Sequence, residues 1–253
     1  TLNRDMTITK TYKSHNFGAN KICDIPVNLG VRHYSGHNYY MWDAAENYWS
    51  GHEWDSADRW QTTSENIYNL NYAKSANDSR WYHEGEGSFE ASINPLFKEL
   101  PNANEMAWYV LRGDAHVDYS TWWEVFGELR SGGIWLKKLS VIAQESGKEP
   151  AALKQADPNG KNLLASYDSY TISSAKGKPA DSEIDKYFFL PGLGFYVMGR
   201  LTAFGTYSPY GFFWSSSAHP SISDNAYYLY FGSGLVSVDS HLRENGIVAQ
   251  PFE

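Results

Sequence analysis

Residues 100–113 read Leu-Pro-Asn-Ala-Asn-Glu-Met-Ala-Trp-Tyr-Val-Leu-Arg-Gly, and they carry the clearest helix signal in the chain. Asn102 is a good helix cap, and Glu105, three residues later, completes a capping-box pattern. Gly113 stands where a helix commonly ends. The apolar face comes from side chains at helical spacing, namely Met106, Tyr109 and Val110. The sequence therefore predicts an α-helix over residues 102–112.

After this helix the chain changes to short segments separated by glycine, serine and proline. A second helix is predicted over Thr121–Leu129 and a strand over Ile134–Ala143, whereas residues 145–161 contain turns and at most a short helix. The later strands predicted are Tyr187–Leu190, Gly194–Val197, Gly211–Ser215, Ala226–Phe231 and Leu235–Asp239. One or two early helices followed by an antiparallel meander indicate the α+β class.

The first 94 residues show little regular periodicity, apart from a predicted strand over Thr7–Tyr12. Val31–Trp60 is crowded with His, Tyr, Trp and acidic residues, and it is predicted to form loops stabilised by their own side chains. This stretch contains four tryptophans that could extend a binding site, namely Trp42, Trp49, Trp54 and Trp60. We expect at least half of them to lie in the core instead. We expect residues 1–94 to form an irregular, β-rich region packed on a domain spanning residues 95–253.

Charge and composition exclude several classes of function. The chain of 253 residues has a formal net charge of −8, which argues against sequence-independent binding of nucleic acid and against a polybasic membrane anchor. No segment approaches the roughly 18 apolar residues of a spanning helix. The single cysteine, Cys23, excludes an intrachain disulfide and a multi-cysteine metal site. We therefore expect no metal ion and no cofactor.

Carboxylates lie beside aromatic residues at Trp42-Asp43, at Glu53-Trp54-Asp55 and around Glu84 and Glu86. A pair of carboxylates is what most glycoside hydrolases use. Because any acidic, aromatic-rich chain contains such neighbours, hydrolysis of a polysaccharide is kept as an alternative, and no catalytic residue is assigned.

The best signal for recognition lies near the C-terminus. Ala226–Phe231 is rich in tyrosine, and along Val236–Arg243 the polar residues at 237, 239, 241 and 243 are predicted to face outward. Antibody loops use a similar composition, although an ordinary solvated strand face is the slight favourite on composition alone. The candidate ligand contacts are Trp214, Ser217, His219, Asp224, Tyr228, Tyr230, Ser237, Asp239, His241 and Arg243.

The segment of residues 100–113 resembles the Leu-Pro helix of prokaryotic C-type lectin-like domains. The formylglycine-generating-enzyme superfamily and the variable proteins of diversity-generating retroelements share that helix. Later segments resemble the C-terminal half of the major paralogous domain of Fibrobacter-type and Bacteroides-type surface proteins. In order, these segments are Phe189–Gly194, Gly211–Ser217, Asp224–Phe231 and Arg243-x-x-Gly246. The resemblance covers about residues 95–253.

The resemblance implies a C-type lectin-like fold, in which two small antiparallel sheets are flanked by helices and late strands and loops carry the ligand surface. It also implies an extracellular or cell-surface location, with a signal or lipoprotein anchor trimmed from this chain. Two departures are clear: Val248-Ala249-Gln250 replaces the family's Val-Arg-Cys ending, and the calcium–sugar signature of animal C-type lectins is missing. No calcium site is carried over. The oxidase chemistry of the formylglycine branch is associated with two cysteines, which argues against that activity here.

We therefore expect a non-enzymatic, secreted or surface-exposed recognition or adhesion protein that binds a glycan or a host or bacterial surface protein. The first alternative is a structural subunit of a fimbria or cell-surface assembly, with fimbrial subunits as partners and an exposed strand edge or groove for pairing. The second is a polysaccharide hydrolase that uses a carboxylate pair.

Overall fold

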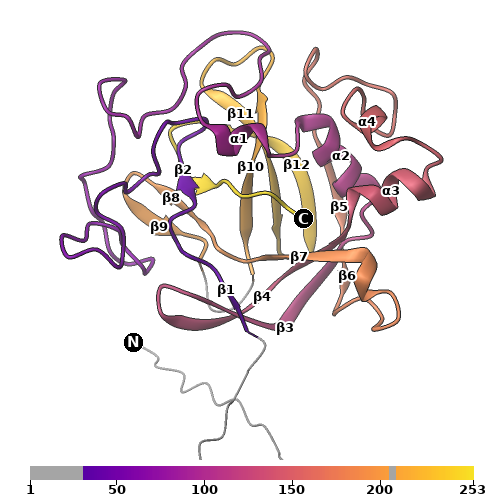
Figure 1. Cartoon of the computed structure of the whole chain (residues 1–253), viewed down its shortest axis with the longest axis horizontal. Helices are drawn as coiled ribbons and strands as arrows, with labels where there is room; N and C mark the ends of the chain where they lie inside the picture. The colour runs from indigo at the N-terminus through magenta and orange to yellow at the C-terminus, as the bar shows by residue number, and fades with distance from the viewer. Residues whose placement is uncertain (1–30, 205–208) are drawn as a thin grey trace, which may run out of the picture.

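Two main sheets and a few short helices make up the protein (Figure 1). The computed structural model describes residues 31–204 and 209–253. The predicted strand Thr7–Tyr12 and Cys23 lie outside the described residues. The described part of the chain consists mostly of strands with a few helices, which confirms the α+β class.

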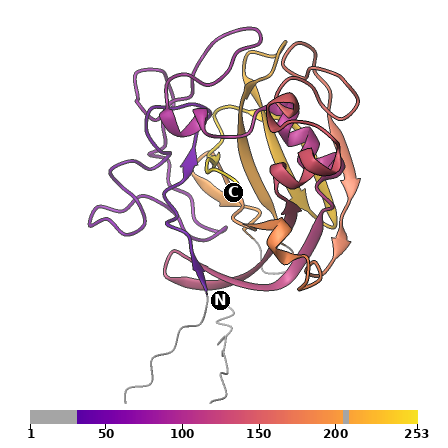
Figure 2. The ribbon, with the colours of Figure 1, turned by 45° about the vertical axis from the view of Figure 1, so that its right-hand side comes forward.

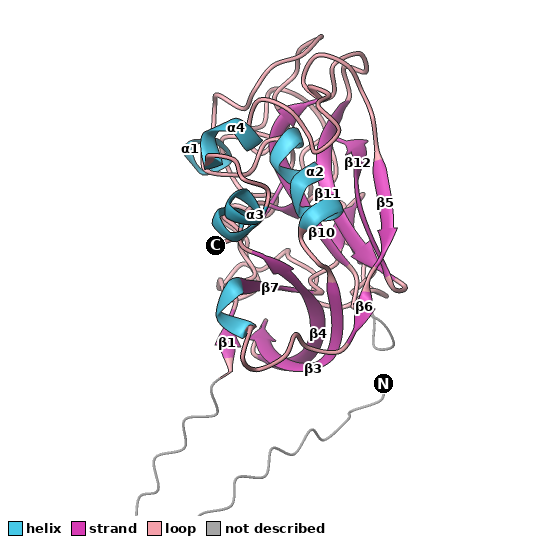
Figure 3. Ribbon diagram, turned by 90° about the vertical axis from the view of Figure 1, so that its right-hand side faces the viewer, coloured by secondary structure: helices cyan, strands magenta, loops and turns pink. Residues whose placement is uncertain are grey.

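The first sheet has five strands and curls at one end of the molecule (Figure 3). β3 pairs antiparallel with β4, which pairs antiparallel with β7, while β1 and β6 both run parallel to β3. The strands are β1 (Arg32–His33), β3 (His116–Val125), β4 (Glu128–Lys137), β6 (Ala175–Lys176) and β7 (Tyr187–Pro191). β7 confirms the predicted strand Tyr187–Leu190.

The second sheet has six strands in the order β2-β13-β10-β11-β12-β5, and it stands upright in Figure 1. Its strands are β2 (Tyr39–Tyr40), β5 (Tyr170–Ser173), β10 (Gly211–Ala218), β11 (Asn225–Gly232), β12 (Leu235–Leu242) and β13 (Ile247–Val248). A separate hairpin joins β8 (Phe195–Val197) to β9 (Arg200–Thr202). The four remaining strand predictions from residue 194 onward are confirmed, because β8, β10, β11 and β12 overlap them.

The longest helix is α2 (Ala103–Arg112), and it confirms the helix predicted from residues 100–113. Both bonds of the capping box are formed: the Asn102 side chain accepts from the Glu105 backbone N–H at 3.0 Å, and the Glu105 carboxylate accepts from the Asn102 N–H at 2.9 Å. The shorter helices are α1 (Pro95–Lys98), α3 (Leu139–Glu145), α4 (Pro150–Leu153) and the 3₁₀ turn η1 (Ile184–Lys186). α4 confirms the short helix expected within residues 145–161.

The helix predicted over Thr121–Leu129 is wrong, because this segment is the turn of the β3–β4 hairpin. Phe126 and Gly127 both have positive φ, at 58° and 70°, as the central residues of a tight type I′ hairpin turn require. The β-branched and aromatic residues before the turn favour a strand.

The strand predicted over Ile134–Ala143 is correct only in its first half. β4 ends at Lys137, and Leu139–Glu145 forms α3. Leu139, Ile142 and Ala143 recur at i, i+3 and i+4, which is the spacing of a helix face, and the last two are buried.

Residues 31–94 form loops that run along one side of the sheets (Figure 2). They contribute a strand to each sheet: β1 lies beside β3, and β2 lies beside β13. The prediction that at least half of the four tryptophans at 42, 49, 54 and 60 serve as core is confirmed, since Trp42 and Trp49 are fully buried.

The six-stranded sheet is packed on both faces. One face, with Leu229 and Val238, belongs to the main core together with α2. The other face, with Trp214 and Ala226, packs against Trp42 and Phe97 from the N-terminal loops and α1. Within the described part of the chain, no helix is both long enough and apolar enough to cross a membrane.

Candidate functional site

Strand pairing gathers five of the predicted contacts on one face of the six-stranded sheet. Tyr228 lies opposite Asp239, and Tyr230 lies opposite Ser237, in the antiparallel register of β11 and β12. His241 follows two residues after Asp239 and so points to the same side. We call these five residues, Tyr228, Tyr230, Ser237, Asp239 and His241, the Tyr–Asp face. All except Ser237 are half-buried, so their polar ends reach solvent while their bodies pack.

The two tyrosines lie over an aromatic base. The ring of Phe212 in β10 is stacked parallel to Tyr228, with centroids 6.0 Å apart, and tilted against Tyr230 at 5.1 Å. Burial raises the pKa of Tyr228, and the negative charge of Asp239 raises it further. Tyr228 therefore stays a protonated phenol at neutral pH. Within the described residues, neither phenol makes a hydrogen bond, so both hydroxyls are available to a ligand.

Asp239 is held at one of its two oxygens. Its Oδ1 accepts from the Tyr167 hydroxyl at 2.6 Å and from the Ser240 backbone N–H at 2.7 Å. Oδ2 makes no hydrogen bond with the described residues, and Asp239 has no ion-pair partner among them. The fixed carboxylate therefore offers one oxygen as an acceptor.

His241 is held in a single tautomer by its neighbours. Its Nδ1 accepts from the Leu242 backbone N–H and from the Asn245 side-chain amide, both at 2.9 Å, so the ring proton sits on Nε2. Its ring stands edge-on to Tyr228 with centroids 5.3 Å apart. Burial lowers the pKa of His241, although Asp239 opposes that shift. At neutral pH this residue is thus an uncharged donor.

His219 is built in the same way but lies outside the Tyr–Asp face. Its Nδ1 accepts from the backbone N–H groups of Ser221 and Ile222, at 3.1 and 2.9 Å. Its ring packs against Tyr167 and Tyr227, with centroids 4.5 and 6.0 Å away. The residue is 2% exposed, and burial lowers the pKa of its imidazole. His219 therefore orders the turn before β11.

Acidification is expected to destabilise the fold through these two histidines. Their folded-state pKa values lie below the unfolded value of about 6.5, so the unfolded chain binds protons first as the pH falls. Their stability contribution is complete above about pH 6.5 and is lost as the pH falls through the folded-state values. The urea midpoint should therefore drop between pH 7.5 and pH 5. The drop should be smaller in a His219→Asn/His241→Asn variant, since Oδ1 of Asn can replace Nδ1. An equal drop in both proteins would contradict this assignment.

Four predicted contacts lie elsewhere. The prediction that Arg243 faces outward is wrong: the residue is fully buried, because the N-terminal loops cover this end of the sheet face with aromatic side chains. Trp214 is also fully buried, and its indole donates to the Tyr40 carbonyl at 2.8 Å. Ser217 is buried at the start of α2, where its hydroxyl accepts from the Ala103 N–H at 3.0 Å. Asp224 is exposed on the turn before β11.

The structure adds residues that the sequence patterns did not single out. Phe212 supports both tyrosines, Tyr167 orients Asp239, and Asn245 orients His241. Phe212 could have been found, because it precedes Trp214 by two residues in a predicted strand and so shares its face. Tyr167 and Asn245 come from a loop and a turn, where no periodicity points to a partner.

The carboxylates considered for hydrolysis are dispersed in structural roles or on the surface. Asp43 is fully buried and accepts four hydrogen bonds from the segment of residues 83–94. Glu53 accepts from the Asn47 amide at 2.8 Å, and Glu84 accepts from the Trp81 indole at 2.8 Å. Across residues 31–204 and 209–253, no group of three or more His, Cys, Asp or Glu side chains could hold a metal ion.

No protein-family model, curated protein or solved structure matches the chain. The Tyr–Asp face is the place where the predicted contacts converge with groups left available for hydrogen bonding.

Proposed function

We propose that the protein is a non-enzymatic recognition module, exposed on a cell surface or secreted, that binds a glycan or a surface protein through the Tyr–Asp face. A C-type lectin-like fold is part of this proposal. Its support is that the segments of the resemblance fall on α2, β7, β10, β11 and the β12–β13 turn, in the order expected.

The available hydrogen-bonding groups of the Tyr–Asp face carry the proposal. The phenols of Tyr228 and Tyr230 and Nε2–H of His241 are donors, while Oδ2 of Asp239 is an acceptor. Their rings are fixed by packing, so binding costs little side-chain entropy. Rigid aromatic bodies with polar tips are typical of recognition surfaces, because the ring supplies contact area and the tip supplies direction.

A binding role fits this face better than hydrolysis. Asp239 is the only carboxylate of the Tyr–Asp face, whereas glycoside hydrolysis generally needs an acid and a second carboxylate on opposite sides of the bond. His241 is fixed as a neutral donor, which suits recognition of hydroxyl and carbonyl oxygens.

Replacing Tyr228 by alanine is expected to weaken ligand binding by at least about tenfold, because truncation of a central tyrosine commonly has that effect. The measurement is binding of wild-type and variant protein to a glycan array and to host matrix proteins, followed by titration of the best ligand. Asp239→Asn should weaken binding too, since it replaces one of the two acceptor oxygens of the carboxylate with an NH₂ donor. Tyr119→Ala is the matched control, because Tyr119 is exposed on β3, in the other sheet.

Three outcomes separate the alternatives. Equal binding by wild type and Tyr228→Ala would remove the Tyr–Asp face as the site. Formation of polymers without binding to any ligand would favour a structural subunit, whose pairing edge would be β5 at the border of the six-stranded sheet. Release of sugar from a polysaccharide panel would establish hydrolysis.

A further inference from the structure

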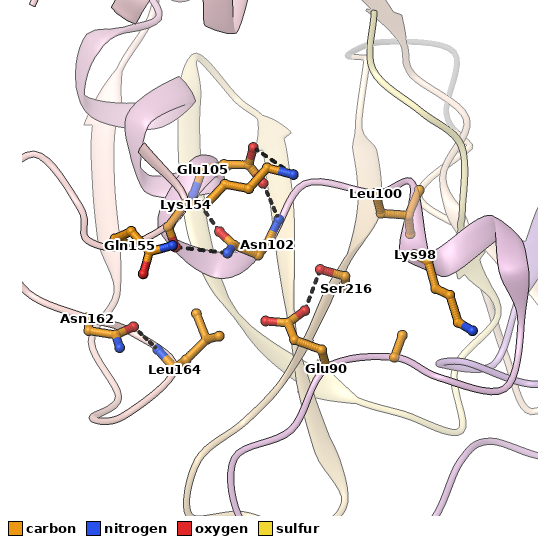
Figure 4. A pocket seen from close by; sticks show the side chains of 11 residues that line it. Glu90, Lys98, Leu100, Asn102, Glu105, Lys154, Gln155, Asn162, Leu164 and Ser216 are labelled. Carbon is orange, nitrogen blue, oxygen red and sulfur yellow. Dashed lines mark hydrogen bonds and ion pairs between the residues drawn. The ribbon is translucent and has the colours of Figure 1, made fainter. Parts of the chain in front are cut away.

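A cavity of about 390 Å³ lies at the beginning of α2, away from the Tyr–Asp face (Figure 4). Its floor is formed by buried residues, with Glu105 and Ser216 as the polar members. Its rim carries exposed charged side chains, namely Glu90, Lys98 and Lys154. The volume is within the range of about 300–1,000 Å³ that small-molecule sites occupy.

Glu105 presents a carboxylate oxygen to this cavity. The residue is 4% exposed, and one of its oxygens is used by the helix cap at Asn102. The other, Oε1, makes no hydrogen bond with the described residues, and its nearest cation is Lys154 Nζ at 3.8 Å. Burial raises the pKa of Glu105, while the hydrogen bond from Asn102 and the charge of Lys154 oppose that shift. A buried carboxylate whose only cation among the described residues is this distant favours a second cation beside it.

Glu90 is fixed at the rim by two serine hydroxyls. Ser216 donates to one oxygen at 2.6 Å, and Ser217 donates to the other at 2.9 Å. No cation lies within ion-pair distance of this carboxylate among the described residues. Figure 4 shows Glu90 and Ser216 across the cavity from Glu105 and Asn102. The cavity is therefore bordered by two carboxylates from different segments, of which only Glu105 has a lysine within ion-pair distance among the described residues.

We propose that this cavity binds a small organic cation, whose ammonium group occupies the space beside Glu105 and Glu90. An ammonium has three donors and no acceptor, which matches carboxylate oxygens that still have lone pairs to offer. The apolar lining of Ala91, Leu100 and Leu164 accommodates a short alkyl chain. Among the described residues, no aromatic side chain lines the cavity, so they offer no stacking surface of the kind that a sugar ring would use. This site shares no lining residue with the Tyr–Asp face and stands independently of the proposed function.

The test is an NMR titration of the ¹⁵N-labelled protein with n-butylamine at pH 7, compared with n-butanol and butyrate. The amine is expected to shift the amide signals of Ala91, Glu105 and Ser216 with saturation, while the alcohol and the acid have no such effect. Glu105→Gln should weaken amine binding by about tenfold, because a charge-assisted hydrogen bond is lost. The fold is preserved in this variant, since glutamine also completes a capping box.

Two further variants are expected to tighten amine binding and to leave it unchanged, respectively. Lys154→Met removes the ammonium that competes for Oε1 of Glu105, so it should tighten amine binding. Glu99→Gln is the matched control, because Glu99 is exposed and does not line the cavity. Absence of amine binding would overturn the proposal, as would equal binding of butanol. Preferred binding of butyrate, with loss in Lys154→Met, would also overturn it and would assign the cavity to an anion.

Discussion

Replacing Arg243 by leucine is expected to lower the free energy of unfolding by about 3 kcal/mol, because three hydrogen bonds of a buried guanidinium and its contacts with two aromatic rings are lost together. The guanidinium donates to the carbonyls of Asn225, His83 and Gly85, at 2.9, 3.0 and 3.2 Å. It also lies over the rings of Trp42 and Phe89, with centroid distances of 4.7 and 4.9 Å. Such cation–π contacts contribute up to about 2 kcal/mol when desolvated. Burial lowers the pKa of Arg243 to about 10, so it remains a cation at neutral pH.

The measurement is urea unfolding of wild type and variants at pH 7.5. Arg243→Lys should also lose stability, since one ammonium lacks the planar fork that reaches several carbonyls. Arg59→Leu is the control, because Arg59 is exposed, and it should change the free energy of unfolding by no more than about 0.5 kcal/mol. A wild-type midpoint in Arg243→Leu would show that these contacts do not hold the loop of residues 83–89 to the sheet.

Arg243 also shows where strand alternation stops being informative. The pattern places Ser237, Asp239 and His241 on one face correctly, because β12 is regular up to Leu242. Pairing continues for one more residue, since the backbone N–H of Arg243 donates to the Asp224 carbonyl. The Arg243 side chain lies against Trp42 and Phe89, whose loops cover this end of the same face. A period-two pattern assigns a side chain to one side of the sheet but has no information about what covers that side.

Local sequence patterns predicted a helix correctly only where capping residues indicate both its first and its last turn. The helix at residues 102–112 was predictable because its capping box and its terminal glycine are formed by neighbours in sequence. In the segment predicted as a second helix, Thr121–Leu129, the Phe126-Gly127 turn went unrecognised, and strand pairing decided the structure. The burial of Trp214 and Ser217 likewise follows from the central place of β10 between β13 and β11, which is a long-range property.

Most of the candidate site was predictable, but its supporting residues were not. Tyr228 and Tyr230 alternate within one strand, and Asp239 and His241 within the next, so the sequence places each pair on one side of its strand, and the register joins the two pairs on one face. The bonds that select an oxygen of Asp239 and a tautomer of His241 come from residues outside both strands. These long-range partners depend on how loops fold back, and no local pattern encodes that.

Replacing Asp43 by alanine is expected to lower the free energy of unfolding by about 3–5 kcal/mol, because four donors lose one buried carboxylate as their shared acceptor. Asp43 is fully buried and has φ of 52°, a conformation that Asp tolerates better than most residues. Oδ2 accepts from the His83 ring and from the Ser92 and Ile93 N–H groups, at 2.7, 2.8 and 3.1 Å. Oδ1 accepts from the Asn94 N–H at 2.9 Å.

The isosteric variant Asp43→Asn separates shape from hydrogen bonding. Its amide NH₂ would face either the three donors at Oδ2 or the one at Oδ1, so it should retain at most part of the lost stability. Urea unfolding measures the loss, and hydrogen exchange at Ser92, Ile93 and Asn94 should accelerate more than exchange in α2. Asp181→Asn, at an exposed position, is the control. Because Asn94 also caps α1, faster exchange confined to residues 92–98 would show that one carboxylate orders the approach to that helix, whereas unchanged exchange there would refute it.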